Sequence, residues 1–181
     1  MTFFINLDSN ILLWIQEYLR FPLLTKIFII ITKTGDKGFI WIVLGLLLLC
    51  FIKTRKVGII MLIALFCSFL INNVWIKNWI ARMRPYEFVN GLEKLIEHQK
   101  DFSFPSGHTA SSFAAAVVIF MTLPRKYGVL ALGYASLIAF SRLYVGVHYP
   151  SDILVAIISG SLIAIAIVKF EEKTRKYNNH V

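Results

Sequence analysis

Cysteine and acidic residues are scarce in this chain. Its two cysteines, Cys50 and Cys67, both lie inside apolar runs, so the sequence offers neither a disulfide framework nor a CxxC metal motif. Its ten aspartates and glutamates form none of the clusters that Mg²⁺ requires. The N-terminus lacks the basic region and the small-residue cleavage site of a cleaved signal peptide. These absences argue against crosslinked and magnesium-dependent architectures and against a removed leader.

Apolar residues dominate instead, at 57% of the 181 residues, with a mean hydropathy of +0.70. Soluble domains do not have this composition, and several runs approach the ~20 apolar residues that cross a bilayer as a helix. Inside lipid a span must satisfy its own backbone hydrogen bonds, which makes these runs helices. The sequence shows no soluble domain, repeat or low-complexity tract. We therefore predict one all-α membrane bundle that occupies residues 1–181.

Six runs are predicted to cross the membrane: residues 21–32, 39–52, 57–75, 104–123, 127–140 and 153–168. The first is short and is interrupted by Lys26, so it could re-enter the membrane instead, which would leave five spans and an outer N-terminus. Residues 1–20 include the amphipathic segment NILLWIQEYLR, which predicts an interfacial helix. Residues 21–168 then form the catalytic bundle, and residues 169–181 form a charged tail.

The formal net charge of +9 could indicate a nucleic-acid partner, but in a membrane protein it more often reflects basic cytoplasmic loops or an anionic lipid or substrate. The basic turns at 53–56 and 125–126 and the tail lie on one side by parity, and the positive-inside rule places that side in the cytoplasm. The loops at 33–38, 77–103 and 141–152 then share the outer face. We expect a multi-pass plasma-membrane protein that binds no nucleic acid.

Two clusters at that face carry groups suited to an anion. Ser106, Gly107 and His108 open an apolar helix, whose first N–H groups and dipole attract anions; taken alone, a helix cap with a stray histidine explains them as well. Lys77 and Arg84 supply cations, although either could simply extend its charge from the end of a span to the interface. Nearby Arg82 is interpreted as an interfacial residue.

The third loop adds Arg142, His148 and Asp152. Asp152 follows His148 by four residues and can accept from one ring nitrogen, which leaves the other as a nucleophile. Together these three clusters place three cations, two histidines and one carboxylate on one membrane face. This is the composition of an oxyanion site. The remaining histidines, His98 and His180, are interpreted as solvated loop and tail residues.

These residues resemble the three-part signature of the type-2 phosphatidic acid phosphatase superfamily, which includes membrane lipid phosphatases and is similar to bacterial acid phosphatases and vanadium haloperoxidases. The matching parts are Lys77-(six residues)-Arg84-Pro85, Pro105-Ser106-Gly107-His108, and Ser141-Arg142-(five residues)-His148-(three residues)-Asp152. Each part is modest alone, but all three are complete and in order.

The resemblance implies the roles of the site residues. His148 would attack phosphorus and form a phosphohistidine, Asp152 would orient it, and His108 would be the general acid and later the base. The phosphate oxygens would be held by Lys77, Arg84, Ser106, Gly107 and Arg142. No metal or other cofactor is expected, because fixed cations can stabilise the charge of phosphoryl transfer.

The expected partner is a lipid phosphate, with undecaprenyl diphosphate as the leading substrate and phosphatidylglycerol phosphate and phosphatidic acid as alternatives. The acidic outer loop at 86–101 is expected to shape head-group choice. Two other functions stay open: a metal site built from His108, His148 and Asp152, and a non-catalytic lipid transporter on the same scaffold. The oligomeric state is left open.

Overall fold

The computed structural model describes residues 2–178, with side chains from residue 6 onward, and all regular secondary structure in that range is helical. The predicted all-α class is confirmed. The elements are α1 (Thr2–Leu19), α2 (Pro22–Thr34), the 3₁₀ turn η1 (Asp36–Gly38), α3 (Phe39–Leu49), α4 (Arg55–Ser68), the π-helix η2 (Phe69–Ile76), α5 (Lys77–Ile80), α6 (Pro85–Phe88), α7 (Gly107–Thr122), α8 (Arg125–Tyr144) and α9 (Pro150–Asn178).

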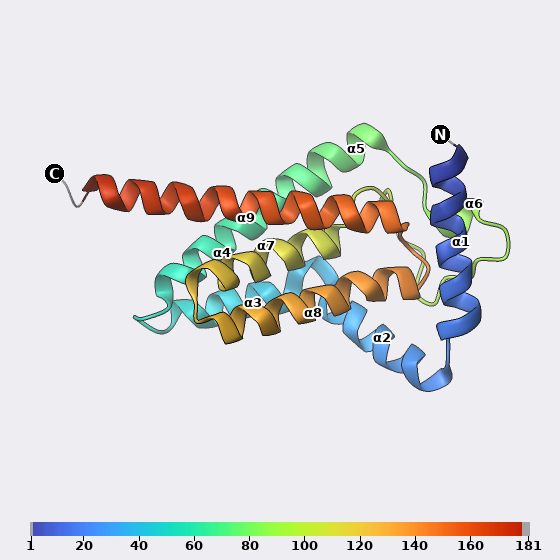
Figure 1. Cartoon of the computed structure of the whole chain (residues 1–181), viewed down its shortest axis with the longest axis horizontal. Helices are drawn as coiled ribbons and strands as arrows, with labels where there is room; N and C mark the ends of the chain where they lie inside the picture. The colour runs from blue at the N-terminus through green and yellow to red at the C-terminus, as the bar shows by residue number, and fades with distance from the viewer. Residues whose placement is uncertain (1, 179–181) are drawn as a thin grey trace.

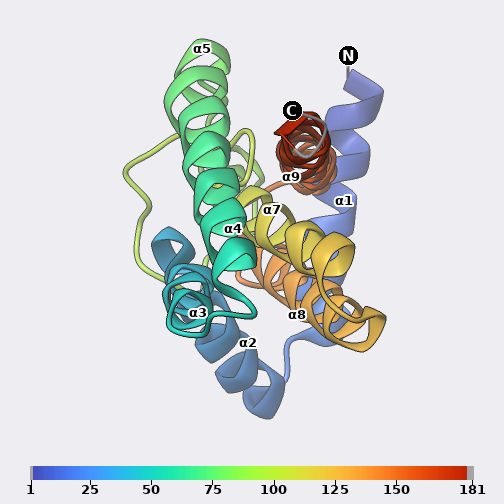
Figure 2. The same ribbon diagram turned by 90° about the vertical axis from the view of Figure 1, so that its left-hand side faces the viewer.

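Helix α7 occupies the centre of the bundle, with α4, α8 and α9 packed around it (Figures 1 and 2). Its sequence suits that position because it is rich in small side chains, and Ala110, Ala114, Ala115 and Ala116 are fully buried. Small residues let helix backbones approach closely, which is how helices associate inside a membrane. The closest approach is at Gly160 of α9, which lies against the carbonyl of Ala110.

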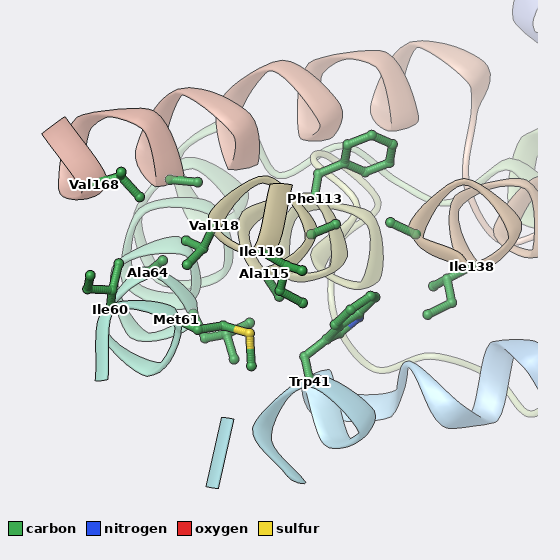
Figure 3. Packing of buried hydrophobic residues seen from close by; sticks show 14 of the residues in the cluster. Trp41, Ile60, Met61, Ala64, Phe113, Ala115, Val118, Ile119, Ile138 and Val168 are labelled. Atoms are coloured by element: carbon green, nitrogen blue, oxygen red, sulfur yellow. The ribbon is translucent and has the colours of Figure 1, made fainter. Parts of the chain in front are cut away.

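Apolar side chains fill the interior and also cover the outside. In the core, Trp41 of α3, Met61 of α4 and Ile138 of α8 pack against α7 (Figure 3), and the indole of Trp41 donates to Ser112 Oγ at 2.9 Å. Large exposed apolar residues on α3, α4, α8 and α9 face outward, as expected where the surrounding solvent is lipid. Among the described residues, the stretches Arg55–Phe88 and Pro150–Asn178 are each long and apolar enough to span a bilayer alone.

Helices α2 and α3 do not form an antiparallel pair. Thr25, near the start of α2, lies 3.0 Å from the hydroxyl of Tyr144, whereas Thr34 at its end lies 2.7 Å from that of Tyr134, so α2 runs antiparallel to α8. After η1, α3 continues toward the basic turn at 53–56 (Figure 1).

The lengths of α2 and α3 are consistent with two successive parts of one path along the bundle. The 13 residues of α2 and the 11 residues of α3 span about 20 Å and about 17 Å. Neither length covers a hydrocarbon core of about 30 Å, but the two in sequence do. Helices α2 and α3 thus follow one another along the bundle, and the number of crossings that they make stays a prediction.

Two predicted boundaries move. The helix expected to end at residue 75 continues through η2 and α5 to Ile80, where Ala81 adopts a left-handed conformation with φ of 49°. Lys77 therefore lies inside a helix and not in a loop. Helix α9 does not stop at residue 168 but runs to Asn178, and its Glu171 pairs with Lys56. The predicted charged tail is thus helical as far as it is described, and His180 lies outside the described residues.

Helix α1 lies across the end of the bundle where α8 ends and α9 begins (Figure 1). Leu12 and Ile15 are buried, whereas Trp14 and Tyr18 on the other side are exposed. Aromatic residues of this kind concentrate at membrane interfaces. The amphipathic helix expected near the N-terminus is present, and it begins eight residues earlier than the segment that predicted it.

The contact between Gly160 and Ala110 yields a stability prediction. A Cβ added at Gly160 would lie 2.3 Å from the Ala110 carbonyl oxygen, so Gly160→Ala forces α7 and α9 apart. Overpacking of this kind costs about 1–3 kcal/mol, and we expect a clearly lower melting temperature in detergent. Gly133→Ala on α8 is the control, because among the described residues nothing lies within 4 Å of the added carbon. Equal melting temperatures for the two variants would contradict this packing.

Candidate active site

A cavity of about 910 Å³ opens at the end of the bundle where α7 begins. Its polar end collects residues from all three predicted loops, and its other end is apolar, formed by α3, α4 and η2. Six of the eight predicted site residues line it: Lys77, Arg84, Gly107, His108, Arg142 and His148. The other two, Ser106 and Asp152, are fully buried beside it.

The first turn of α7 forms one wall. Ser106 is the N-cap, and its Oγ accepts from the N–H of Thr109 at 3.4 Å and from the Thr109 hydroxyl at 3.0 Å. The capping role that the sequence suggested for Ser106 is thus present. A Cβ on Gly107 would lie 2.6 Å from the side-chain amide of Asn73, so a larger residue would require the Asn73 side chain to shift. His108 follows in the cavity, and its Nε2 lies 2.8 Å from Asp36 Oδ1 of η1.

His148 occupies the short loop between α8 and α9. Gly146 supplies the turn with φ of +76°, a conformation that favours glycine. The guanidinium of Arg84 approaches His148 Nε2 at 3.3 Å. Because arginine can only donate, Nε2 is the nitrogen with the free lone pair and Nδ1 carries the proton. The lone pair thus lies on the nitrogen that faces the cations.

Behind His148, the proton on Nδ1 faces Ser103 and Asp152. The distances from Nδ1 are 3.4 Å to Ser103 Oγ and 3.5 Å to Asp152 Oδ2. Ser103 in turn donates to Asp152 Oδ2 at 2.5 Å, and the Tyr149 N–H donates to the same oxygen at 3.0 Å. The predicted pair of His148 and Asp152 is therefore adjacent, and a serine bridges it.

The surroundings keep His148 neutral. Complete burial, followed by the charges of Arg84 and Arg142, holds the pKa of its imidazole well below the ordinary value. A neutral ring keeps its lone pair at physiological pH, which is what a nitrogen nucleophile requires. The arrangement is thus chemically suited to attack on an electrophile placed in the cavity.

Two cations that line the cavity, Lys77 and Arg84, pair with the same carboxylate. Asp101 Oδ2 lies 2.5 Å from Lys77 Nζ, and Asp101 Oδ1 lies 2.6 Å from an Arg84 nitrogen. Partial burial opposes ionisation of Asp101, but the two cations outweigh it and hold the pKa of the carboxyl below its usual range. The Asp101 side chain is 51% exposed, whereas those of Lys77 and Arg84 are buried. A carboxylate thus occupies a position that suits the oxygens of another anion.

Arg142 is only partly satisfied. One terminal nitrogen donates to Thr32 Oγ1 at 2.5 Å, but its buried Nε has no hydrogen-bond partner among the side chains of residues 6–178. A buried unpaired donor on a charged group is costly. Arg142 also lines the cavity, so its guanidinium is placed to bind an oxyanion there.

Sequence reasoning missed four residues around the site: Asp36, Arg82, Asp101 and Ser103. Arg82 was interpreted as interfacial, yet it donates to Asp152 at 2.6 Å. Asp101 was treated as one of several acidic loop residues. Their positions depend on how loops distant in sequence meet, although Ser103 and Asp101 do lie within five residues of Ser106. His98 was placed correctly as an exposed loop residue, and it lies beside Lys94.

Comparison with known proteins agrees with this site. Residues 53–176 match the model of the PAP2 superfamily. The undecaprenyl-diphosphatase of Sulfolobus acidocaldarius is 33% identical over 92% of this chain and 80% of its own length, and phosphatidylglycerophosphatase B of Bacillus subtilis is 30% identical over 88% and 81%.

The fold is also similar to that of a solved membrane protein. The crystal structure of a transmembrane PAP2-type phosphatidylglycerolphosphate phosphatase from Bacillus subtilis superposes with a TM-score of 0.77 at 29% identity, over 93% of this chain and 86% of the other. The matched region includes every residue of the three-part signature. The chain belongs to the PAP2 superfamily, and it is a membrane lipid phosphatase of that superfamily.

Proposed function

We propose that this phosphatase removes the terminal phosphate of undecaprenyl diphosphate through a phosphohistidine at His148. The observation that carries the proposal is a set of three buried cations around one cavity, one with an unpaired Nε and two held by a displaceable carboxylate. Next to them stands a neutral imidazole with its lone pair directed toward Arg84.

The chemistry takes two steps. His148 Nε2 attacks phosphorus in line, an N–P bond forms, and the P–O bond to the lipid leaving group breaks while His108 protonates the departing oxygen. Water then attacks the phosphohistidine with His108 as the base, which releases inorganic phosphate and returns His148 to its starting state. Asp152 stabilises the positive charge that develops on the ring, through Ser103. The placement of His108 in the same cavity, held by Asp36, supports its role.

The cations bind the phosphoryl oxygens. Phosphoryl transfer spreads negative charge over those oxygens, so fixed positive groups stabilise the transition state electrostatically. Lys77, Arg84 and Arg142 fill this role, with the N–H of Gly107 at the helix N-terminus. Ser106 contributes by capping that helix and so keeping the N–H groups in place. The same charges repel a metal ion, which disfavours a metal site at His108 and His148.

The apolar end of the cavity supports a lipid substrate. The cavity is also lined by the apolar residues Ile42, Leu62, Leu65, Phe66 and Phe69 of α3, α4 and η2. A hydrocarbon chain can lie there while the phosphate reaches His148. The two relatives described above are named for different lipids, so phosphatidylglycerol phosphate is the alternative substrate, with phosphatidic acid after it.

For the membrane arrangement we propose five crossings: α2 with α3, α4 with η2 and α5, α7, α8, and α9. The basic turns at 53–56 and 125–126 face the cytoplasm, and the cavity faces the outer side. Because α1 lies at the cavity end, the N-terminus is on the outer side, with Trp14 and Tyr18 at the interface. Residues 169–178 extend α9 on the cytoplasmic side.

His148→Ala is expected to reduce phosphate release by about 10⁴-fold or more, because no other group can form the phosphoenzyme. Phosphate release would be measured with detergent-purified protein, in the presence of a chelator, on undecaprenyl diphosphate, phosphatidylglycerol phosphate and phosphatidic acid. His98→Ala, an exposed histidine of the outer loop, is the matched control and should keep full activity.

The outcomes of that experiment separate the alternatives. Near-normal activity of His148→Ala would remove the nucleophile assignment. Loss of activity with the chelator would favour the metal site. No release from any lipid would favour the transporter.

Arg142→Lys should lower kcat by about tenfold to 100-fold, since lysine keeps the charge but loses the fork and the Nε donor. Arg125→Lys, in the exposed basic turn at the other end, should leave kcat unchanged. Full activity of Arg142→Lys would mean that Arg142 serves only to tie α8 to Thr32 of α2.

Asp101→Asn should strengthen inhibition by inorganic phosphate, because the carboxylate no longer competes for Lys77 and Arg84. We expect the inhibition constant to fall about fivefold, the equivalent of about 1 kcal/mol for a half-exposed ion pair. Glu97→Gln in the same loop is the control and should not change it. A weaker inhibition in Asp101→Asn would show that Asp101 supports the cations instead of competing with phosphate.

A further inference from the structure

Arg82 lies behind the catalytic pair and not at a free interface. One terminal nitrogen donates to Asp152 Oδ1 at 2.6 Å and to Ser151 Oγ at 2.7 Å. The guanidinium also stacks 3.8 Å above the ring of Tyr149, which fixes its plane. Its backbone carbonyl accepts from the N–H of Ser103 at 2.7 Å. Arg82 thus contacts both groups that stand behind His148.

Asp8 of α1 holds the other side of the same guanidinium. Its Oδ2 accepts from Arg82 at 2.9 Å and from the Ser151 hydroxyl at 2.5 Å, and its Oδ1 accepts from the Ser151 N–H at 3.0 Å. Asp8 is buried, and its carboxylate accepts from the N–H of Ser151 in the first turn of α9. Ser151 follows His148 by three residues. A residue from the N-terminal helix therefore reaches the rear of the active site.

The network stabilises the buried charge of Asp152. Asp152 is completely buried, and a buried carboxylate is stable only when it is paired and hydrogen-bonded. Its Oδ2 accepts from Ser103 and from the Tyr149 N–H, and its Oδ1 accepts from Arg82. The planar fork of arginine can bridge two carboxylates at once, which a lysine ammonium does less rigidly.

We propose that Arg82 and Asp8 are a pair of positioning residues for the reaction, and that α1 is part of the active site. Arg82 sets the orientation of the Asp152 carboxylate, and Asp8 sets the orientation of Arg82. Ser103, which contacts both Asp152 and His148, orients the imidazole ring. The proposal rests on the proposed function, because it requires His148 to be the nucleophile. Neither residue lines the cavity in which phosphate would bind.

The first test compares Arg82→Gln, Arg82→Lys and Asp8→Asn in the full-length, detergent-purified protein. Groups that orient the ligands of a reactive centre typically contribute 10- to 100-fold, and we expect Arg82→Gln to lower kcat within about that range. Arg82→Lys should recover part of the loss, and Asp8→Asn should lower kcat less than Arg82→Gln does. The rate of phosphoenzyme formation in a single turnover should fall in parallel. The inhibition constant for inorganic phosphate should stay within about twofold, since the cations are intact.

The second test is the double variant Arg82→Gln with Asp8→Asn. If Asp8 acts through Arg82, the double variant should be about as slow as Arg82→Gln alone, because coupled residues are not additive. Lys94→Gln is the matched control: Lys94 lies 4.7 Å above the ring of Tyr86 in the same outer region and has no role in the network, so its kcat should not change.

The outcomes are distinguishable. Full kcat in Arg82→Gln, with His148→Ala inactive, overturns the positioning role and leaves the proposed function intact. Activity in His148→Ala overturns the proposed function itself. If the kcat losses of the two single variants multiply in the double variant, Asp8 does not act through Arg82 and the proposed pair is overturned. A lower kcat that comes with a lower melting temperature and weaker phosphate inhibition also overturns it, because that pattern indicates a structural role only.

Discussion

Positive charge buried against a cavity is the constraint on which the rest of this structure depends. Lys77, Arg84 and Arg142 are all nearly inaccessible, and such charges are tolerated only with anions or acceptors nearby. Asp101 pairs with Lys77 and Arg84, and backbone carbonyls also accept from Arg84. Thr32 accepts from Arg142, whose Nε has no hydrogen-bond partner among the described residues. An oxyanion in the cavity would add acceptors for these cations, which is the basis of the phosphate-binding role that we propose for them.

The same constraint explains why the site lies at one end of the bundle. The interior around α7 is packed with small and apolar side chains, which leave no partner for a charge. At the end where α7 begins, helix termini, loop carbonyls and carboxylates provide partners, and the cavity still opens onto apolar surface. A lipid phosphate combines the same two properties, because it has a charged head and an apolar chain.

Much of the site could be predicted, because spacing along a helix or a turn is local. His148 and Asp152 follow from a four-residue separation, and Ser106 to His108 follow from a helix start. The course of α2 could not be predicted, because an apolar run of 13 residues suits a tilted segment as well as a short span, and only its contacts with Tyr144 and Tyr134 give its direction. Arg82 was misjudged because an arginine beside a span looks like an anchor until its partners are known.

The sequence by itself determined the all-α class, the membrane environment and the chemistry, because hydropathy and local motif spacing depend only on neighbours in the chain. The tertiary structure alone decided that four residues meet behind His148, namely Asp8, Arg82, Ser103 and Asp152. It also decided that Asp101 pairs with Lys77 and Arg84. The same network joins residues far apart in the chain, because Asp8 accepts from Ser151, which lies 143 positions away. Such proximity arises only when helices pack, because contacts between distant segments depend on how the whole bundle closes.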